Sequence, residues 1–197
     1  MFALHGAMST PAISKVAVFE PVLFVGQPGL EEFTAVISRG RRLLADGDVG
    51  GAMASLARDA QGSDPRARAV SAPYRLMGRI MTRPAVNRAL LWADAHLAKG
   101  DDVPLSDLIV AWEQELAVVE ASEGTIADYR NVTAEVLLLC GVGAPELFTG
   151  TLDALEDVLP RATRVDVPGV NHGGPQTQGG NPAVIAEHLR RFFTSGT

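Results

Sequence analysis

The sequence predicts an α/β fold in which a small parallel sheet is interrupted by a long helical insertion. Three short runs, at residues 16–19, 136–140 and 164–167, have the apolar or β-branched character of buried strands. A helical pattern follows each of the last two runs, whereas residues 28–124 show helical periodicity and no strand pattern. The alternation of strand and helix implies parallel strands that are joined by right-handed crossovers.

The chain opens with a predicted helix of small and apolar residues at positions 1–9, which Ser-Thr-Pro ends. Residues 16–19 are wholly apolar, as expected for a strand that is buried on both faces. Glu20 and Pro21 mark the exit of this strand.

The insertion contains several segments with apolar residues at helical spacing, separated by glycine, proline and polar breakers. We predict helices at residues 30–44, 50–60, 66–81, 84–98 and 105–122. Pro84 fits the first turn of its helix because the missing N–H would be unpaired there in any case.

The pattern changes after the insertion. The run at 136–140 ends at Gly141, a helix is predicted at 145–159, and the third strand follows at 164–167. A closing helix is predicted at 182–193, with Asn181 as its N-terminal cap and Pro182 in its first turn.

Composition excludes several classes of protein. The chain has 197 residues, of which 47% are hydrophobic and 20% charged, and this is ordinary for a globular domain. The net charge of −6 argues against nucleic acid or an anionic membrane as the partner. The single cysteine, Cys140, cannot form an internal disulfide, which suits a reducing cytoplasm. No apolar run approaches the roughly 20 residues that span a bilayer, so we expect a cytoplasmic protein.

His172 is the leading candidate for chemistry. It follows the last predicted strand in a loop rich in glycine and proline, and imidazole is the side chain that titrates nearest to working pH. Such a group suits proton transfer but needs a nucleophile to activate. No histidines and carboxylates show metal-ligand spacing, so neither a metal nor another cofactor is expected.

The order of these segments resembles the C-terminal portion of the α/β-hydrolase superfamily. Residues 16–21 are similar to the sixth strand of that fold and its exit, and residues 136–141 to the seventh strand. Residues 169–172, Gly-Val-Asn-His, are similar to the Gly-x-x-His pattern of the histidine loop. The resemblance implies a partial α/β-hydrolase core at 1–27 and 131–197, a helical cap at 28–130 inserted between strands, and a small-molecule substrate.

The resemblance also implies roles for individual residues. His172 would be the histidine of a catalytic triad, acting as general base and then as general acid. The usual position of the acid, beyond the seventh strand, holds Ala144 here. Some relatives take the acid from the end of the sixth strand, where this chain has Glu20. Glu146 is the other candidate, although a carboxylate in the first turn of a helix commonly just complements the helix dipole.

The sequence lacks the nucleophile that the resemblance implies. No Gly-x-Ser-x-Gly elbow occurs, and residues 1–9 resemble the body of the helix that would follow such an elbow. We therefore expect a truncated chain that is inactive alone, although the intact enzyme would hydrolyse an ester, acyl or similar bond. The alternative is a non-catalytic remnant or a binding module of the same fold. In either case the small predicted sheet would have an exposed edge where the rest of the fold is missing, and such an edge predicts self-association.

Overall fold

The computed structural model describes residues 2–52, 55, 84–97, 107, 114, 116–177 and 180–195. The chain divides into two compact units, one of residues 1–28 with 119–197 and the other of residues 29–118. The sequence assigned residues up to 130 to the insertion. Residues 119–130 belong to the first unit because the 3-10 helix η1 (Ile126–Asn131) packs against elements of that unit, and its Tyr129 is fully buried.

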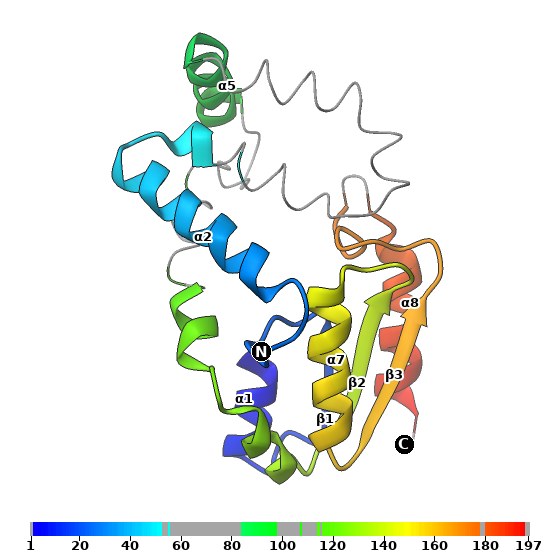
Figure 1. The fold of residues 1–197 in the computed structure, drawn as a ribbon. Helices are drawn as coiled ribbons and strands as arrows, with labels where there is room; N and C mark the ends of the chain where they lie inside the picture. Colours follow the sequence, from blue (N-terminus) through cyan, green and yellow to red (C-terminus); the bar gives the residue numbers. More distant parts are fainter. Residues whose placement is uncertain are drawn as a thin grey trace. The chain divides into compact units, whose positions relative to one another are not determined.

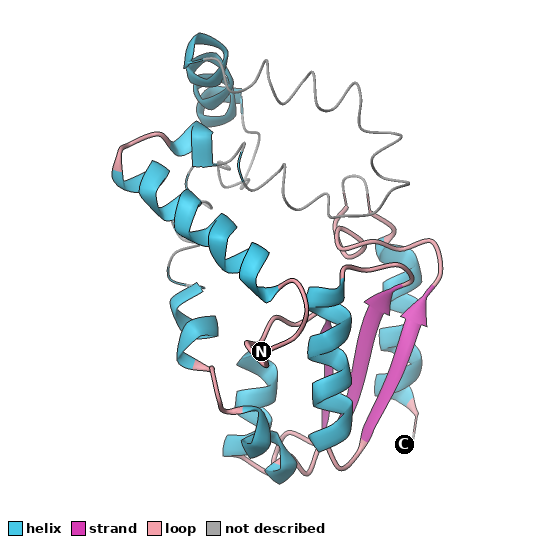
Figure 2. Cartoon of the chain, viewed as in Figure 1, coloured by secondary structure: helices cyan, strands magenta, loops and turns pink. Residues whose placement is uncertain are grey.

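The first unit contains a parallel sheet of three strands, in the order β1-β2-β3 (Figures 1 and 2). The strands are β1 (Lys15–Phe19), β2 (Glu135–Gly141) and β3 (Ala162–Val167). Val16 lies opposite Val136, and Val136 opposite Ala162. The predicted parallel sheet is confirmed, with the most apolar run, β2, in the central position.

Helices cover both faces of this sheet. The helices α1 (Phe2–Ser9) and α7 (Glu146–Val158) pack on one face together with η1, and α8 (Pro182–Thr194) lies on the other (Figure 1). Because side chains alternate along a strand, β2 supplies apolar residues to both faces. The α1–α7 face buries Val136 and Leu138, and the α8 face buries Leu137 and Leu139. The sheet therefore lies between two small hydrophobic cores, one on each of its faces.

The second unit contains the helices α2 (Leu30–Ala45) and α5 (Pro84–Leu97). Their bounds agree with the helices predicted at 30–44 and 84–98. The helix predicted at 66–81 lies outside the described residues, as do most of the helix predicted at 50–60 and half of that predicted at 105–122.

The start of α8 differs from the prediction in one respect. Pro182 is in the first turn, as predicted, but the Asn181 side chain makes no capping hydrogen bond. Instead the backbone N–H of Asn181 donates to the carbonyl of Gly174 at 2.9 Å. The start of α8 is thus tied by backbone to the loop that carries His172, which a local capping rule does not anticipate.

Lys15 ties the first strand to the end of the last helix. Its Nζ donates to the carbonyls of Phe192 and Ser195, and it lies 5.3 Å above the centre of the Phe192 ring. The Lys15 side chain is only 18% exposed. A cation there satisfies carbonyls at the C-terminus of α8 that have no partner within the helix.

We expect Lys15→Met to lower the free energy of unfolding by about 1–2 kcal/mol, because it removes charge-assisted hydrogen bonds at a partly buried position. Urea denaturation measures the change. Arg190→Met is the matched control, because Arg190 is an exposed cation on α8 whose ion pair, among the described residues, is with Glu187 of the same helix. A Lys15→Met effect no larger than that of the control would contradict the assignment.

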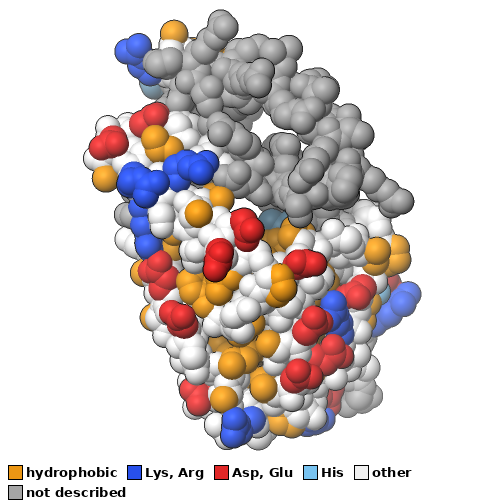
Figure 3. Space-filling view, in the orientation of Figure 1, with side chains coloured by type: hydrophobic (Ala, Val, Ile, Leu, Met, Phe, Trp, Pro, Cys, Tyr) orange, Lys and Arg blue, Asp and Glu red, His pale blue; other side chains and the backbone are white. Residues whose placement is uncertain are grey.

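On the face shown in Figure 3, acidic side chains gather over α7 and β3. Arg164 of β3 pairs there with Asp153 and Asp166. No helix within the described residues combines the length and the apolar character needed to cross a membrane.

One edge of β1 has no partner among the described strands. The N–H of Glu20 donates to Leu139 of β2, so the alternation of the strand turns the N–H groups of Ala17 and Phe19 toward the other edge.

We expect the chain to associate through this unpaired edge of β1 as its concentration rises, which sedimentation velocity would detect. Ala17→Pro should reduce association because it removes an outward N–H. Unchanged association of that variant would locate the contact elsewhere.

Candidate active site

The candidate site lies where the carboxyl ends of the three strands meet. Glu20 directly follows β1, Gly141 ends β2, and His172 lies in the loop after β3. In open parallel sheets this edge is where ligands bind, because the connecting loops there converge. All three residues belong to the first unit.

Glu20 and His172 are in direct contact. Nδ1 of His172 lies 2.7 Å from Oε2 of Glu20. The Glu20 side chain is fully buried, whereas that of His172 is 57% exposed. A carboxylate only accepts hydrogen bonds, so the ring donates from Nδ1. The other ring nitrogen, Nε2, makes no hydrogen bond to any described residue, which leaves it open as a base.

The backbone at Glu20 is strained. Its φ is 42°, and within the described part of the chain it is the one residue other than glycine with a positive φ. An L-residue enters this region at a cost of about 1–3 kcal/mol, and such residues cluster at functional sites. The turn at Glu20 ends the strand and carries the carboxylate across the end of β2 toward His172.

Gly141 donates a hydrogen bond to the second carboxylate oxygen of Glu20. Its N–H donates to Oε1 of Glu20 at 3.0 Å, which leaves Oε2 for His172. Gly141 is also approached closely by the histidine loop. A Cβ at this position would lie 2.2 Å from the carbonyl oxygen of Val170. The absence of a side chain therefore lets the loop come close enough for His172 to reach Glu20.

Cys140 lies beside the same carboxylate, with its Sγ 3.8 Å from Oε1 of Glu20. Burial, together with the negative charges of Glu20 and Asp166, raises the pKa of the thiol to about 12 from an ordinary value of 9.0. Cys140 therefore keeps its proton and acts as a weak donor. Its burial agrees with the buried strand predicted at residues 136–140.

The raised pKa of Cys140 predicts a pH-dependent stability. The thiol stabilises the folded state fully below pH 9.0, and this contribution is lost as the pH rises toward 12, because the unfolded chain ionises first. Between about pH 8 and pH 10, the free energy of unfolding should fall by about 1.4 kcal/mol more than in Cys140→Ala. Urea denaturation of both proteins at the two pH values measures this difference. Parallel pH dependences would contradict the assignment.

An aromatic side chain lies against His172. The ring of Phe148, on α7, is stacked on the imidazole with centroids 4.5 Å apart and an interplanar angle of 13°. One face of the imidazole is thus covered by carbon, while Nδ1 faces Glu20.

The two candidate acids lie in different environments. Glu20 contacts His172, whereas Glu146 lies exposed in the first turn of α7. Ala144 lies in the turn that follows β2. No group of three or more histidine, cysteine or acidic side chains among the described residues could hold a metal ion.

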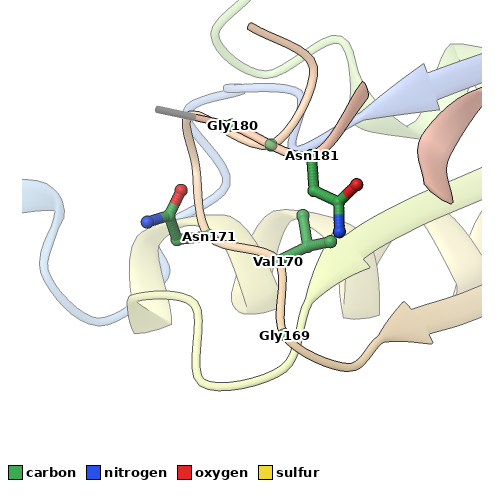
Figure 4. A pocket seen from close by; sticks show the side chains of 6 residues that line it. Gly169, Val170, Asn171, Gly180 and Asn181 are labelled. Carbon is green, nitrogen blue, oxygen red and sulfur yellow. The ribbon is translucent and has the colours of Figure 1, made fainter. Parts of the chain in front are cut away.

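A cavity of about 280 Å³ lies beside the histidine loop (Figure 4). Gly169, Val170, Gly174 and Gly180 line it with the two asparagines Asn171 and Asn181. Neither His172 nor Glu20 lines this cavity. It is formed by the folding of the loop on itself, and backbone hydrogen bonds such as that from Gly174 to Asn171 close that loop.

The two residues that the sequence singled out, Glu20 and His172, lie in contact, but the groups around them were not anticipated. The stacked ring of Phe148 and the contact of Val170 with Gly141 join segments that lie apart in the sequence. One local signal was available, because Gly141 ends a strand otherwise made of large apolar residues. A glycine in that place commonly marks a close approach by another part of the backbone.

Comparison with known proteins gives structural matches only. No protein-family model matches the chain, and no curated protein matches it. A crystal structure of an α/β hydrolase from Sphaerobacter thermophilus superposes with a TM-score of 0.59 at 21% sequence identity, covering 97% of this chain. A proline iminopeptidase from Mycobacterium smegmatis gives a TM-score of 0.42 at 18% identity, covering 98%.

The chain spans 62% of the length of each of these two structures. At such low sequence identity, the first match shows the fold and no more. The parallel order of β1, β2 and β3, with helices on both faces, agrees with that match. The chain therefore has part of the α/β-hydrolase fold.

Proposed function

We propose that Glu20 and His172 are the acid and the base of a hydrolase that cleaves an ester, acyl or similar bond in a small organic molecule. The observation that carries this proposal is the 2.7 Å contact between Nδ1 of His172 and a fully buried Glu20 carboxylate on a strained backbone. In this arrangement Nε2 would take the proton of a nucleophile, and Glu20 would stabilise the imidazolium that forms. His172 would then return the proton to the leaving group.

The nucleophile is the missing part of this proposal. The 197 residues contain no Gly-x-Ser-x-Gly elbow. The loop from α1 to β1 spans only residues 10–14, so the end of α1 adjoins the start of β1. The first turn of α1 therefore lies toward the carboxyl ends of the strands, where Glu20 and His172 are located. We propose that a segment joined to this turn would deliver the nucleophile to Nε2.

Sequencing the coding DNA upstream of Met1 tests whether a segment that carries the nucleophile is encoded there. An in-frame Gly-x-Ser-x-Gly shortly before the Met1 codon supports the proposal. The protein translated from that longer frame should then hydrolyse a para-nitrophenyl ester and lose this activity on His172→Ala. A longer protein with an elbow whose activity survives His172→Ala would refute the assigned base.

The chain of 197 residues should release para-nitrophenol no faster than the uncatalysed background. Mass spectrometry after incubation with the ester should likewise find no acylated serine. Turnover by this chain that His172→Ala abolishes would show that a nucleophile lies within it, and would refute the missing-nucleophile part of the proposal.

A further inference from the structure

The Glu20 contact alone does not fix the orientation of the His172 ring. The hydrogen bond holds Nδ1 but allows the ring to rotate about the line that joins Nδ1 to Oε2 of Glu20. The ring is more than half exposed, and it lies in a loop rich in glycine between Gly169 and Gly180. A base must present its free nitrogen in a defined direction, so a second contact is needed.

Phe148 supplies a second contact at a different part of the ring. Its phenyl ring lies nearly parallel to the imidazole, at 13°, with the centroids 4.5 Å apart. Rotation of the imidazole about the hydrogen bond would drive one edge of the ring into the phenyl face. The hydrogen bond and the stacked ring together therefore define both the position and the plane of His172.

The helix that carries Phe148 is firmly anchored. The side chains of Leu147, Leu152 and Leu155 on α7 are 8%, 0% and 0% exposed. A rigid support of this kind is what distinguishes a positioning contact from a chance surface contact.

The same helix also holds the chain that follows Glu20. Nε2 of the buried Gln27 donates to Oγ1 of Thr151 at 3.0 Å and to the carbonyl of Leu147 at 3.3 Å. Gly150 admits this side chain, because a Cβ there would lie 2.6 Å from Cβ of Gln27. α7 therefore contacts both the segment that leaves the acid and the ring of the base.

We propose that Phe148 is a positioning residue, which acts through His172 by fixing the plane of the imidazole so that Nδ1 faces Glu20 and Nε2 faces the reacting group. This inference rests on the proposed function of the Glu20–His172 pair. Phe148 itself touches neither the nucleophile nor the substrate in this account. The anchoring of α7 by Gln27 keeps the acid and the base in a common frame.

NMR of the His172 ring tests this inference on the chain itself, at about pH 8, where most imidazoles are neutral. The ¹⁵N shifts report the tautomer, and ¹³C relaxation of the ring carbons reports how far the ring plane moves. The unchanged chain should show His172 with its proton on Nδ1. Phe148→Leu should leave the proton on Nδ1 but release the ring plane, so that the Cδ2 and Cε1 carbons of His172 show a larger amplitude of ring motion, and Phe148→Tyr, which keeps the flat ring, should restore the fixed plane. Phe193→Leu is the matched control, because Phe193 is a half-exposed ring on α8. A folded Phe148→Leu variant whose His172 ring carbons relax as they do in the unchanged chain would overturn the inference.

A second measurement does not depend on the folding of a variant. In the unchanged chain, nuclear Overhauser effects should join the ring protons of Phe148 to Hε1 and Hδ2 of His172. Their absence would also overturn the inference. Glu20→Gln separates the two proposals. If it leaves the His172 tautomer unchanged, the acid–base pair itself is refuted. A tautomer that changes with Glu20→Gln, together with ring motion that Phe148→Leu leaves unchanged, refutes only the role of Phe148.

Discussion

Gly141→Ala is expected to lower the free energy of unfolding by about 1–3 kcal/mol and to separate His172 from Glu20. The new methyl group would lie 2.2 Å from the carbonyl oxygen of Val170 and 2.9 Å from its carbonyl carbon. These are backbone atoms, which cannot rotate away as a side chain can. The histidine loop must therefore move outward, and a displacement of about 1 Å is enough to lower a rate by about 100-fold.

The control for this substitution is Gly173→Ala, which lies in the same loop next to His172. A methyl group there would approach only the ends of the Asn171 and Gln176 side chains, at 3.3 Å, and these can move. Urea denaturation and the ¹⁵N signal of Nδ1 in both variants measure the two effects. Equal stability of Gly141→Ala and the unchanged chain, with the Nδ1 signal intact, would show that the loop does not depend on this close approach.

Glu20→Gln is expected to abolish the base function of His172 while leaving the shape of the site almost unchanged. The amide oxygen can still accept the N–H of Gly141, but the amide nitrogen would donate to Nδ1 of His172. The ring would then carry its proton on Nε2, where it could not accept one from a nucleophile. In serine proteases the equivalent substitution lowers kcat by about 10⁴-fold. We expect a loss of that order in a hydrolytically active form of the protein.

Glu146→Gln is the matched control for that experiment. It makes the same chemical change at an exposed position in the first turn of α7. Initial rates with a para-nitrophenyl ester should be close to those of the unchanged enzyme. A large loss with Glu146→Gln and none with Glu20→Gln would reverse the assignment of the acid.

The sheet and its order could be predicted because each strand carries its own signal. The run at 136–140 is apolar throughout, as a central parallel strand must be, since both of its faces are covered. The helix at 30–44 was likewise evident from its periodicity, and its bounds differ by one residue at most from those of α2. Such features depend on residues that are close in the sequence.

The site could be predicted only in part. The position of Glu20 at a strand exit and the Gly-x-x-His sequence before His172 were local signals, and the structure brings these two residues together. The contacts that support the site join distant segments. One example is the hydrogen bond between Gln27 and Thr151, which are 124 residues apart. The strain at Glu20 depends on the path between β1 and the end of β2, and the dipeptide Glu-Pro alone does not specify it.

The tautomer of His172 in the unchanged chain tests the central claim most directly. ¹⁵N NMR of a histidine-labelled sample, at about pH 8, separates the signals of a protonated and an unprotonated ring nitrogen. We expect a proton on Nδ1, which is held by Glu20, and a free Nε2 that can act as a base. A proton on Nε2, or a Nδ1 signal that Glu20→Ala leaves unchanged, would contradict the pairing on which the proposed function rests.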